Sequence, residues 1–124
     1  MPRHDNPEEQ LQRAVVEYLR WTKPDVVWFF VNNGARLSKA QAGKAIGLGV
    51  LPGVADLAFT LPGGQSAYIE LKVEGAYLSP AQRDFSTKAQ ALGAWYALAR
   101  SIEDVEGTLK AWGVTFAHGR GRAA

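Results

Sequence analysis

Apolar residues recur at every fourth position near the start of the chain, at Leu11, Val15 and Leu19. This spacing is typical of one face of a helix, and we predict a helix over residues 7–21. Asn6 suits the N-cap, because a side-chain oxygen at that position accepts a free backbone N–H group of the first turn. The sequence therefore predicts a helix with a defined start and one face to bury.

The pattern then changes to short apolar runs that are typical of strands. Residues 26–31 are all β-branched or aromatic, which predicts a strand buried on both faces of a sheet. Residues 56–61 and 67–73 flank a Pro-Gly-Gly turn at 62–64, so we expect two adjacent antiparallel strands there. Residues 94–99 form a further strand.

Three further helices are expected after the first strand, at 39–46, from Ser79 to about Leu92, and from Ser101 to about Trp112. The resulting order, α-β-(α)-β-β-α-β-α, predicts an α/β fold in which helices flank a central mixed β-sheet. The length is that of one small domain. We assign this domain to residues 1–117 and expect a basic, flexible tail over residues 118–124.

The composition fits a packed domain in water. Of the 124 residues, 47% are hydrophobic and 21% are charged, which excludes intrinsic disorder for most of the chain. Lys and Arg number 14 against 12 Asp and Glu, so the net charge is only +2. No segment reaches the roughly 20 apolar residues of a membrane span, and the first residues lack the apolar core of a signal peptide. We expect a cytoplasmic protein with no membrane partner.

Cysteine is absent, which excludes a disulfide scaffold, a zinc site built on thiolates and a thiol nucleophile. A metal site would have to use oxygen ligands or the two imidazoles, His4 and His118. Both histidines lie near the ends of the chain, and nothing around them suggests a ligand role.

The predicted hairpin carries the candidate chemistry. Glu70 and Lys72 point to the same face of their strand, and pairing about the turn brings Asp56 close to Glu70. Two carboxylates at one point repel each other unless a cation lies between them. Mg²⁺ fits this donor set, with Mn²⁺ as a substitute, and the Leu71 carbonyl is a further candidate ligand. Such an ion activates water and binds phosphate oxygens, and Lys72 would stabilise the developing charge, which suits phosphodiester hydrolysis.

Each of these residues also has a simpler interpretation. Asp56 alone would be a turn residue, and Glu70 with Lys72 would be a solvent-exposed ion pair of little energetic value. The combination of all three favours the catalytic interpretation.

Three more polar side chains are candidates for the site. Glu8 and Gln12 share the helix face that carries Leu11; Glu8 is a candidate metal ligand or a helix-dipole residue, and Gln12 is a supporting residue or a boundary residue. Gln82 would lie beside the site, although its capping-box position also explains it. We interpret Glu9 as a cap rather than a ligand.

Basic residues cluster before the Asp56 strand, at Arg36, Lys39 and Lys44. They are candidates for holding DNA phosphates. Their alternative role is that of solvated surface charges.

The residues around this hairpin resemble a known family. The pattern Asp56…Glu70-x-Lys72 resembles the D…ExK signature of the PD-(D/E)xK nuclease superfamily, and a wider ordered set resembles the virus-type replication-repair nuclease (VRR-NUC) family. That set spans Glu8 to Val105 and comprises Pro7-Glu8, Gln12, Asn33-Gly34, Lys44, Gly49, Pro52-Gly53, Asp56, Glu70-x-Lys72, Gly75, Leu78-Ser79-Pro80-x-Gln82 and Gly93.

The resemblance implies a restriction-endonuclease-like core and metal-dependent cleavage of DNA. It implies Asp56 and Glu70 as metal ligands, Lys72 as the catalytic lysine and Glu8 as the glutamate of the first helix. Stand-alone members of the family resemble homodimeric four-way-junction (Holliday-junction) resolvases, whereas the domain within larger repair nucleases acts on flaps. The family name also points toward phage or mobile-element DNA.

We therefore expect a Mg²⁺-dependent endonuclease that acts as a homodimer on branched DNA, since two symmetric sites can cut opposed strands. The alternatives are a flap or nicking endonuclease and a non-catalytic DNA-binding module on the same fold. A sequence-specific restriction enzyme would need base-reading elements, and we identify none.

Overall fold

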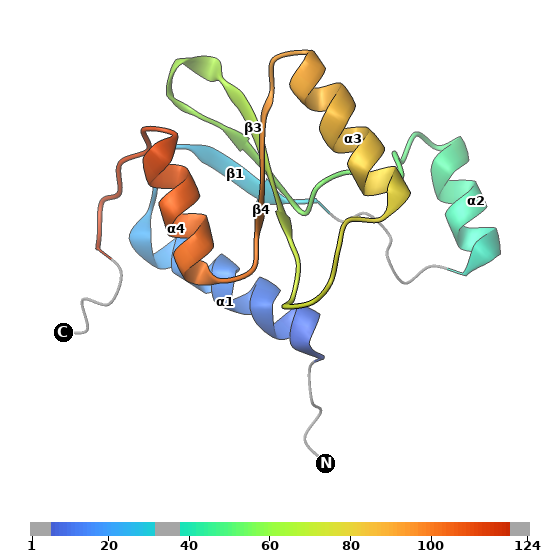
Figure 1. Cartoon of the computed structure of the whole chain (residues 1–124), viewed down its shortest axis with the longest axis horizontal. Coiled ribbons are helices and arrows are strands. Elements are labelled where there is room, and N and C mark those ends of the chain that lie inside the picture. The colour runs from blue at the N-terminus through green and yellow to red at the C-terminus, as the bar shows by residue number, and fades with distance from the viewer. Residues whose placement is uncertain (1–5, 32–37, 120–124) are drawn as a thin grey trace.

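The computed structural model describes residues 6–31 and 38–119, and its elements follow the predicted order (Figure 1). The helices are α1 (Pro7–Thr22), α2 (Lys39–Gly47), α3 (Pro80–Ala91) and α4 (Ile102–Ala111). The strands are β1 (Val27–Phe30), β2 (Leu57–Thr60), β3 (Ser66–Leu71) and β4 (Trp95–Ala99), with a short 3₁₀ turn, η1 (Pro62–Gly64), between β2 and β3. Among the helices described, none combines the length and apolar character that a membrane crossing requires.

The four strands form one mixed sheet in the order β1-β2-β3-β4. The pairs β1–β2 and β2–β3 are antiparallel, and β3–β4 is parallel. Leu57 of β2 is paired with Ile69 of β3, so Asp56 and Glu70 are adjacent in the hairpin, as predicted. The sheet and its flanking helices confirm the predicted α/β fold class with a central mixed sheet.

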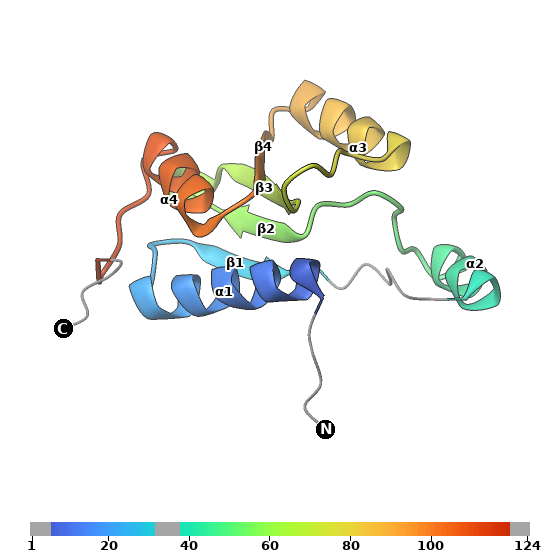
Figure 2. The ribbon, with the colours of Figure 1, turned by 60° about the horizontal axis from the view of Figure 1, so that its bottom comes forward.

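The hydrophobic core lies between one face of the sheet and the helices α1 and α4 (Figure 2). Val15 and Leu19 of α1 are fully buried, as the helical spacing predicted, and pack with Leu57, Ile69 and Leu109. Asn6 caps α1 by accepting the Glu9 N–H at 2.8 Å. The helix therefore begins where the sequence places it, and its polar first turn is left facing the end of the sheet.

The helix α3 packs on the opposite face of the sheet. The centroid of the Phe85 ring lies 5.0 Å from that of Tyr68 on β3 and 6.3 Å from that of Tyr96 on β4. The Ser79 cap and the Gln82 side chain form a complete capping box at the start of this helix. These contacts bring the start of α3 close to the end of β3.

The prediction that residues 26–31 are buried on both faces is wrong. β1 is an edge strand, and Val27 and Phe29 expose 65% and 56% of their surface. The cause is that α3 packs on β3 and β4 and no described element packs over the outer face of β1. Periodicity indicates a strand here but does not indicate how far a covering helix extends.

His118, the first residue of the predicted tail, contacts the end of α1. The His118 N–H donates to the Thr22 carbonyl at 3.0 Å, and the His118 ring stacks on Trp21 with centroids 5.6 Å apart. His118 therefore packs on the end of α1, whereas residues 120–124 of the predicted tail lie outside the described residues.

Candidate active site

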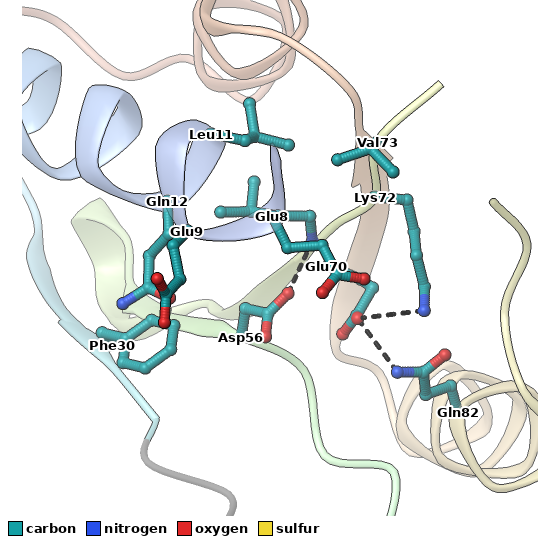
Figure 3. Close-up of a pocket in the computed structure, with 11 residues that line it drawn as sticks. Glu8, Glu9, Leu11, Gln12, Phe30, Asp56, Glu70, Lys72, Val73 and Gln82 are labelled. Carbon is teal, nitrogen blue, oxygen red and sulfur yellow. Dashed lines mark hydrogen bonds and ion pairs between the residues drawn. The ribbon is translucent and has the colours of Figure 1, made fainter. Parts of the chain in front are cut away.

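A pocket opens where the start of α1, the segment just before β2, the end of β3 and the start of α3 meet (Figure 3). Its lining combines acidic, basic and amide side chains with a few apolar ones. These are Glu8, Glu9, Leu11, Gln12, Phe30, Asp56, Glu70, Leu71, Lys72, Val73 and Gln82. The pocket thus gathers Asp56, Glu70, Lys72, Glu8, Gln12 and Gln82, all of which the sequence singled out.

Asp56 and Glu70 are two neighbouring carboxylates in the lining of the pocket. Asp56 Oδ2 accepts the Leu71 N–H at 2.8 Å, which fixes the aspartate against the end of β3. Glu70 is 3% exposed, and its Oε1 is buried with no hydrogen-bond partner in the described part of the chain. Glu70 Oε1 is therefore a buried acceptor that no donor in the described residues satisfies.

Burial dominates the electrostatics of this pair. It raises the pKa of Glu70 to about 8, and the charge of Asp56 adds to that rise. Burial also raises the pKa of Asp56, although the Leu71 N–H works in the opposite direction. Without a cation, the pair consequently holds a proton near neutral pH, and a cation that enters must displace it.

Lys72 and Gln82 converge on the same oxygen of Glu70. Gln82 Nε2 donates to Glu70 Oε2 at 3.1 Å, and Lys72 Nζ lies 4.0 Å from that oxygen. The Lys72 side chain is only 19% exposed. Its ammonium group therefore lies inside the pocket beside the carboxylates, and the simpler interpretation of an exposed surface ion pair does not describe this geometry.

Gln82 has both of the roles considered from the sequence. The side-chain Oε1 of Gln82 accepts the Ser79 N–H at 2.8 Å, and the backbone N–H of Gln82 donates to Ser79 Oγ at 3.2 Å. The Nε2 end of the same amide is the group that reaches Glu70. One end of the Gln82 amide therefore caps α3, and the other end contacts the acidic pair.

The residues of α1 border the pocket without completing a three-ligand cluster. Figure 3 shows the Glu8 side chain directed toward the Asp56–Glu70 pair, and the Glu8 charge contributes to the raised pKa of Asp56. Within residues 6–31 and 38–119, however, no three His, Cys, Asp or Glu side chains gather closely enough to hold a metal ion. Gln12 lines the pocket, as does Glu9, which the sequence analysis treated only as a cap.

Oxygen donors for a hard divalent cation are nevertheless present. Asp56 and Glu70 supply two adjacent carboxylates, and the unpartnered Glu70 Oε1 is an acceptor without a donor. Mg²⁺ typically takes one or two carboxylates and keeps several waters, so this donor set fits it. Leu71 lines the same pocket and is the remaining protein ligand expected from the sequence.

The predicted phosphate-binding residues are not part of this pocket. Lys39 and Lys44 lie on α2, which Figure 1 shows set apart from the sheet, and neither lines the pocket. Arg36 lies outside the described residues.

Tyr96 is a neighbour of the site that was not expected from the sequence. It lies on β4 opposite Tyr68, two residues from the position that faces Glu70. Its hydroxyl is buried without a partner among the described residues, and burial followed by the charges of Glu70 and Asp56 raises its pKa above the usual range. Only the parallel pairing of β3 with β4 places it here, and no local sequence signal shows that pairing.

Solved structures with the same fold are known. A structure described as "VRR_NUC domain protein" superposes with a TM-score of 0.62 at 20% identity, and the match covers 89% of this chain and 90% of that one. A second, described as "VRR_NUC domain", gives a TM-score of 0.58 at 18% identity and covers 86% of this chain and 97% of that one. No family model and no curated protein matches the sequence. The chain therefore has the fold of the VRR_NUC domain.

Proposed function

We propose that this chain is a metal-dependent VRR-NUC nuclease that hydrolyses phosphodiester bonds in DNA. The observation that carries the proposal is the pairing of Asp56 with the buried Glu70, with Lys72 and Gln82 both on Glu70 Oε2. A structural ion pair between Lys72 and the buried Glu70 would not require a second carboxylate and an amide at the same point. The VRR_NUC names of the structural neighbours are consistent with this chemistry.

Each polar side chain has a specific part in the proposed reaction. Asp56 and Glu70 would hold Mg²⁺, or Mn²⁺ in its place, and the ion would supply a water of lowered pKa and polarise a phosphate oxygen. Lys72 would hold the attacking water or stabilise the negative charge that builds up on the phosphate. Gln82 keeps the Glu70 carboxylate in one orientation, and Glu8 adds negative charge at the rim of the pocket.

Cleavage of labelled DNA tests the proposal. We expect linear, flapped or four-way-junction DNA to be cut with Mg²⁺ or Mn²⁺, but not in EDTA and not by Lys72→Ala. Lys88→Ala is the matched control, because Lys88 is 74% exposed and pairs with Asp84 on the surface of α3. DNA that is bound tightly but never cut would instead assign the fold to a binding module.

We further propose that the enzyme acts as a homodimer on branched DNA. Two surfaces of the described chain lack a covering element: the outer face of β1, with Val27 and Phe29, and the helix α2. None of the nine residues of α2 is buried, and the apolar residues Ile46 and Leu48 at its end are exposed. An isolated helix of that length is marginal in water, so α2 needs a packing partner, and a second copy would supply one.

Sedimentation tests the dimer. We expect a dimer at micromolar protein and a monomer for the paired change Val27→Ser and Phe29→Ser. Leu92→Ser is the control, because Leu92 is 89% exposed at the far end of α3. Symmetric paired nicks in a four-way junction by the dimer would support a resolvase, whereas single nicks or flap removal by a monomer would support the alternative endonuclease.

A further inference from the structure

Tyr77 is a large aromatic residue that the fold leaves in solvent next to the pocket. It is 79% exposed and lies in the loop between β3, which carries Glu70, and α3, which carries Gln82. A buried tyrosine ring normally contributes to the stability of the fold, and an exposed ring does not make this contribution. Its position between the two elements that build the site suggests that the ring contacts a ligand of the site.

Arg100 ties the Tyr77 ring to the pocket wall. The Arg100 guanidinium lies 5.9 Å from the ring centroid, and Nη1 donates to the Val73 carbonyl at 2.6 Å. Val73 is itself a pocket residue. Ala99, the residue before Arg100, also contacts a pocket residue, because its carbonyl accepts the Lys72 N–H at 3.0 Å. The ring is therefore linked through Arg100 to Val73, in the wall of the pocket that also contains Lys72.

The loop that carries Tyr77 is also fixed in shape. The Ala76 N–H donates to the Val73 carbonyl at 3.1 Å, and Gly75 adopts φ +85°, which closes a tight turn. The guanidinium engages the ring in a cation–π contact, and most of the ring surface stays open. A planar surface that is already ordered loses little conformational entropy when a second planar group stacks on it.

We propose that Tyr77 stacks on an unpaired nucleobase next to the scissile phosphate. This inference rests on the proposed function, because it takes DNA as the substrate. In a continuous duplex, both faces of each base are covered by its neighbours. A free base face exists only where stacking is interrupted, at a branch, flap, bulge or end. The ring thus favours interrupted DNA over linear duplex and would determine part of the enzyme's substrate specificity.

A fluorescent base tests the stacking directly. The probe is 2-aminopurine, placed as the unpaired nucleotide at the branch of a flapped DNA, and its fluorescence is quenched by stacking. The protein carries Lys72→Ala so that the DNA stays intact. In this background we expect quenching, and we expect Tyr77→Ala to abolish it and to weaken branched-DNA binding by about 5- to 100-fold, the range for loss of one stacked base. Binding to linear duplex should change little.

Two controls separate the ring from other effects. Tyr77→Phe keeps the ring and should keep the quenching and the affinity. Trp21→Ala removes another exposed aromatic residue, one that stacks on His118 at the other end of α1, and should change neither quantity.

The outcomes distinguish the two proposals. Unchanged quenching and affinity in Tyr77→Ala would overturn the stacking proposal. The proposed nuclease function would stand as long as the wild type still cuts DNA. Loss of both in Tyr77→Phe would also overturn it, because the hydroxyl would then be the contact. Wild-type protein that neither binds nor cuts any DNA would overturn the proposed function, and the stacking inference with it.

Discussion

The backbone of Gly53 lies directly against the backbone of Ala81, at the first turn of α3. Gly53 has φ +82°, and a β-carbon there would overlap the Ala81 carbonyl and lie 2.8 Å from the Gln82 nitrogen. The loop that leads to Asp56 and the helix that carries Gln82 are thus in contact without room for a side chain. This contact fixes the distance between the two walls of the pocket.

We expect Gly53→Ala to destabilise the fold and to displace Gln82. Both the left-handed backbone and the overlap oppose the β-carbon, so the free energy of unfolding should fall by roughly 3 kcal/mol or more. Urea unfolding measures this loss. Gly64→Ala is the control, because Gly64 has φ +83° but no atom within 4 Å of an added β-carbon. Equal losses in the two variants would show that the contact with Ala81 contributes nothing.

Without metal, we expect stability to fall as the pH rises from about 4.5 to about 8. The folded state raises the pKa of Glu70 to about 8, above its ordinary value of 4.5. Between these values the folded protein binds more protons than the unfolded chain, so each pH unit costs at most about 1.4 kcal/mol. Urea unfolding in EDTA across this range measures the slope.

Glu70→Gln should reduce this slope because the glutamine does not titrate. Asp84→Asn should leave it unchanged, because Asp84 is 63% exposed on α3. A slope in Glu70→Gln as steep as in the wild type would assign the pH dependence to another group.

Divalent metal should raise the melting temperature and release protons. An ion that takes the place of the proton on the Asp56–Glu70 pair binds only the folded state, and its affinity should increase as the pH approaches about 8. Calorimetry with Mg²⁺ or Mn²⁺ in two buffers of different ionisation enthalpy measures the proton release. Binding that is as tight in Asp56→Asn as in the wild type would place the ion elsewhere.

Gln82→Glu should separate helix capping from the acidic pair. Glutamate still accepts the Ser79 N–H, so the capping box survives, but a carboxylate then faces Glu70 Oε2. We expect a further rise in the pKa of Glu70 and a loss of cleavage of about tenfold or more, the cost of one lost charge-assisted hydrogen bond.

Gln41→Glu is the matched control for this change. It alters the same position of the Ser38–Gln41 capping box of α2, which is distant from the pocket. Wild-type activity in Gln82→Glu would show that the contact with Glu70 has no catalytic importance.

Tyr96→Phe should leave the metal-free protein as stable as the wild type or about 1 kcal/mol more stable. The hydroxyl is buried without a partner in the described residues, and removing such a group relieves its desolvation cost. Thermal unfolding measures the difference. Tyr68→Phe is the comparison, on the paired position of β3 and against the same Phe85 ring. A clear loss of stability in Tyr96→Phe alone would reveal a bound water that joins the hydroxyl to the acidic pair.

Local rules were enough to predict most of the hairpin and the placement of its polar side chains. A turn and the period of two in a strand place Asp56, Glu70 and Lys72 together, and the caps at Asn6 and Ser79 are set by neighbouring residues. These features depend on residues that are close in the chain. The structure confirms their placement, although their catalytic roles stay predictions.

Contacts between distant segments could not be predicted in the same way. The exposure of Phe29 depends on where α3 ends over the sheet, and the position of Tyr96 depends on the parallel pairing of β4. The contact of Gly53 with Ala81 joins residues that are far apart in the chain. The only sign of this contact in the sequence is the glycine itself. Lys39 and Lys44 lie away from the pocket because of the path that the chain takes before β2. The spacing of residues in the sequence does not determine that path.

The amide of Gln82 has a consequence for how this position can vary among descendants of the protein. A residue there must accept the Ser79 N–H and donate to Glu70 from one side chain. Glutamate lacks the donor, asparagine is one carbon shorter, and other side chains of this length lack one group or both. Selection for a folded protein and selection for its chemistry therefore act on the same codon. A lineage that lost the proposed cleavage but kept the fold would be free to replace this glutamine with another capping residue, so its replacement would be an early sign that the proposed activity had been lost.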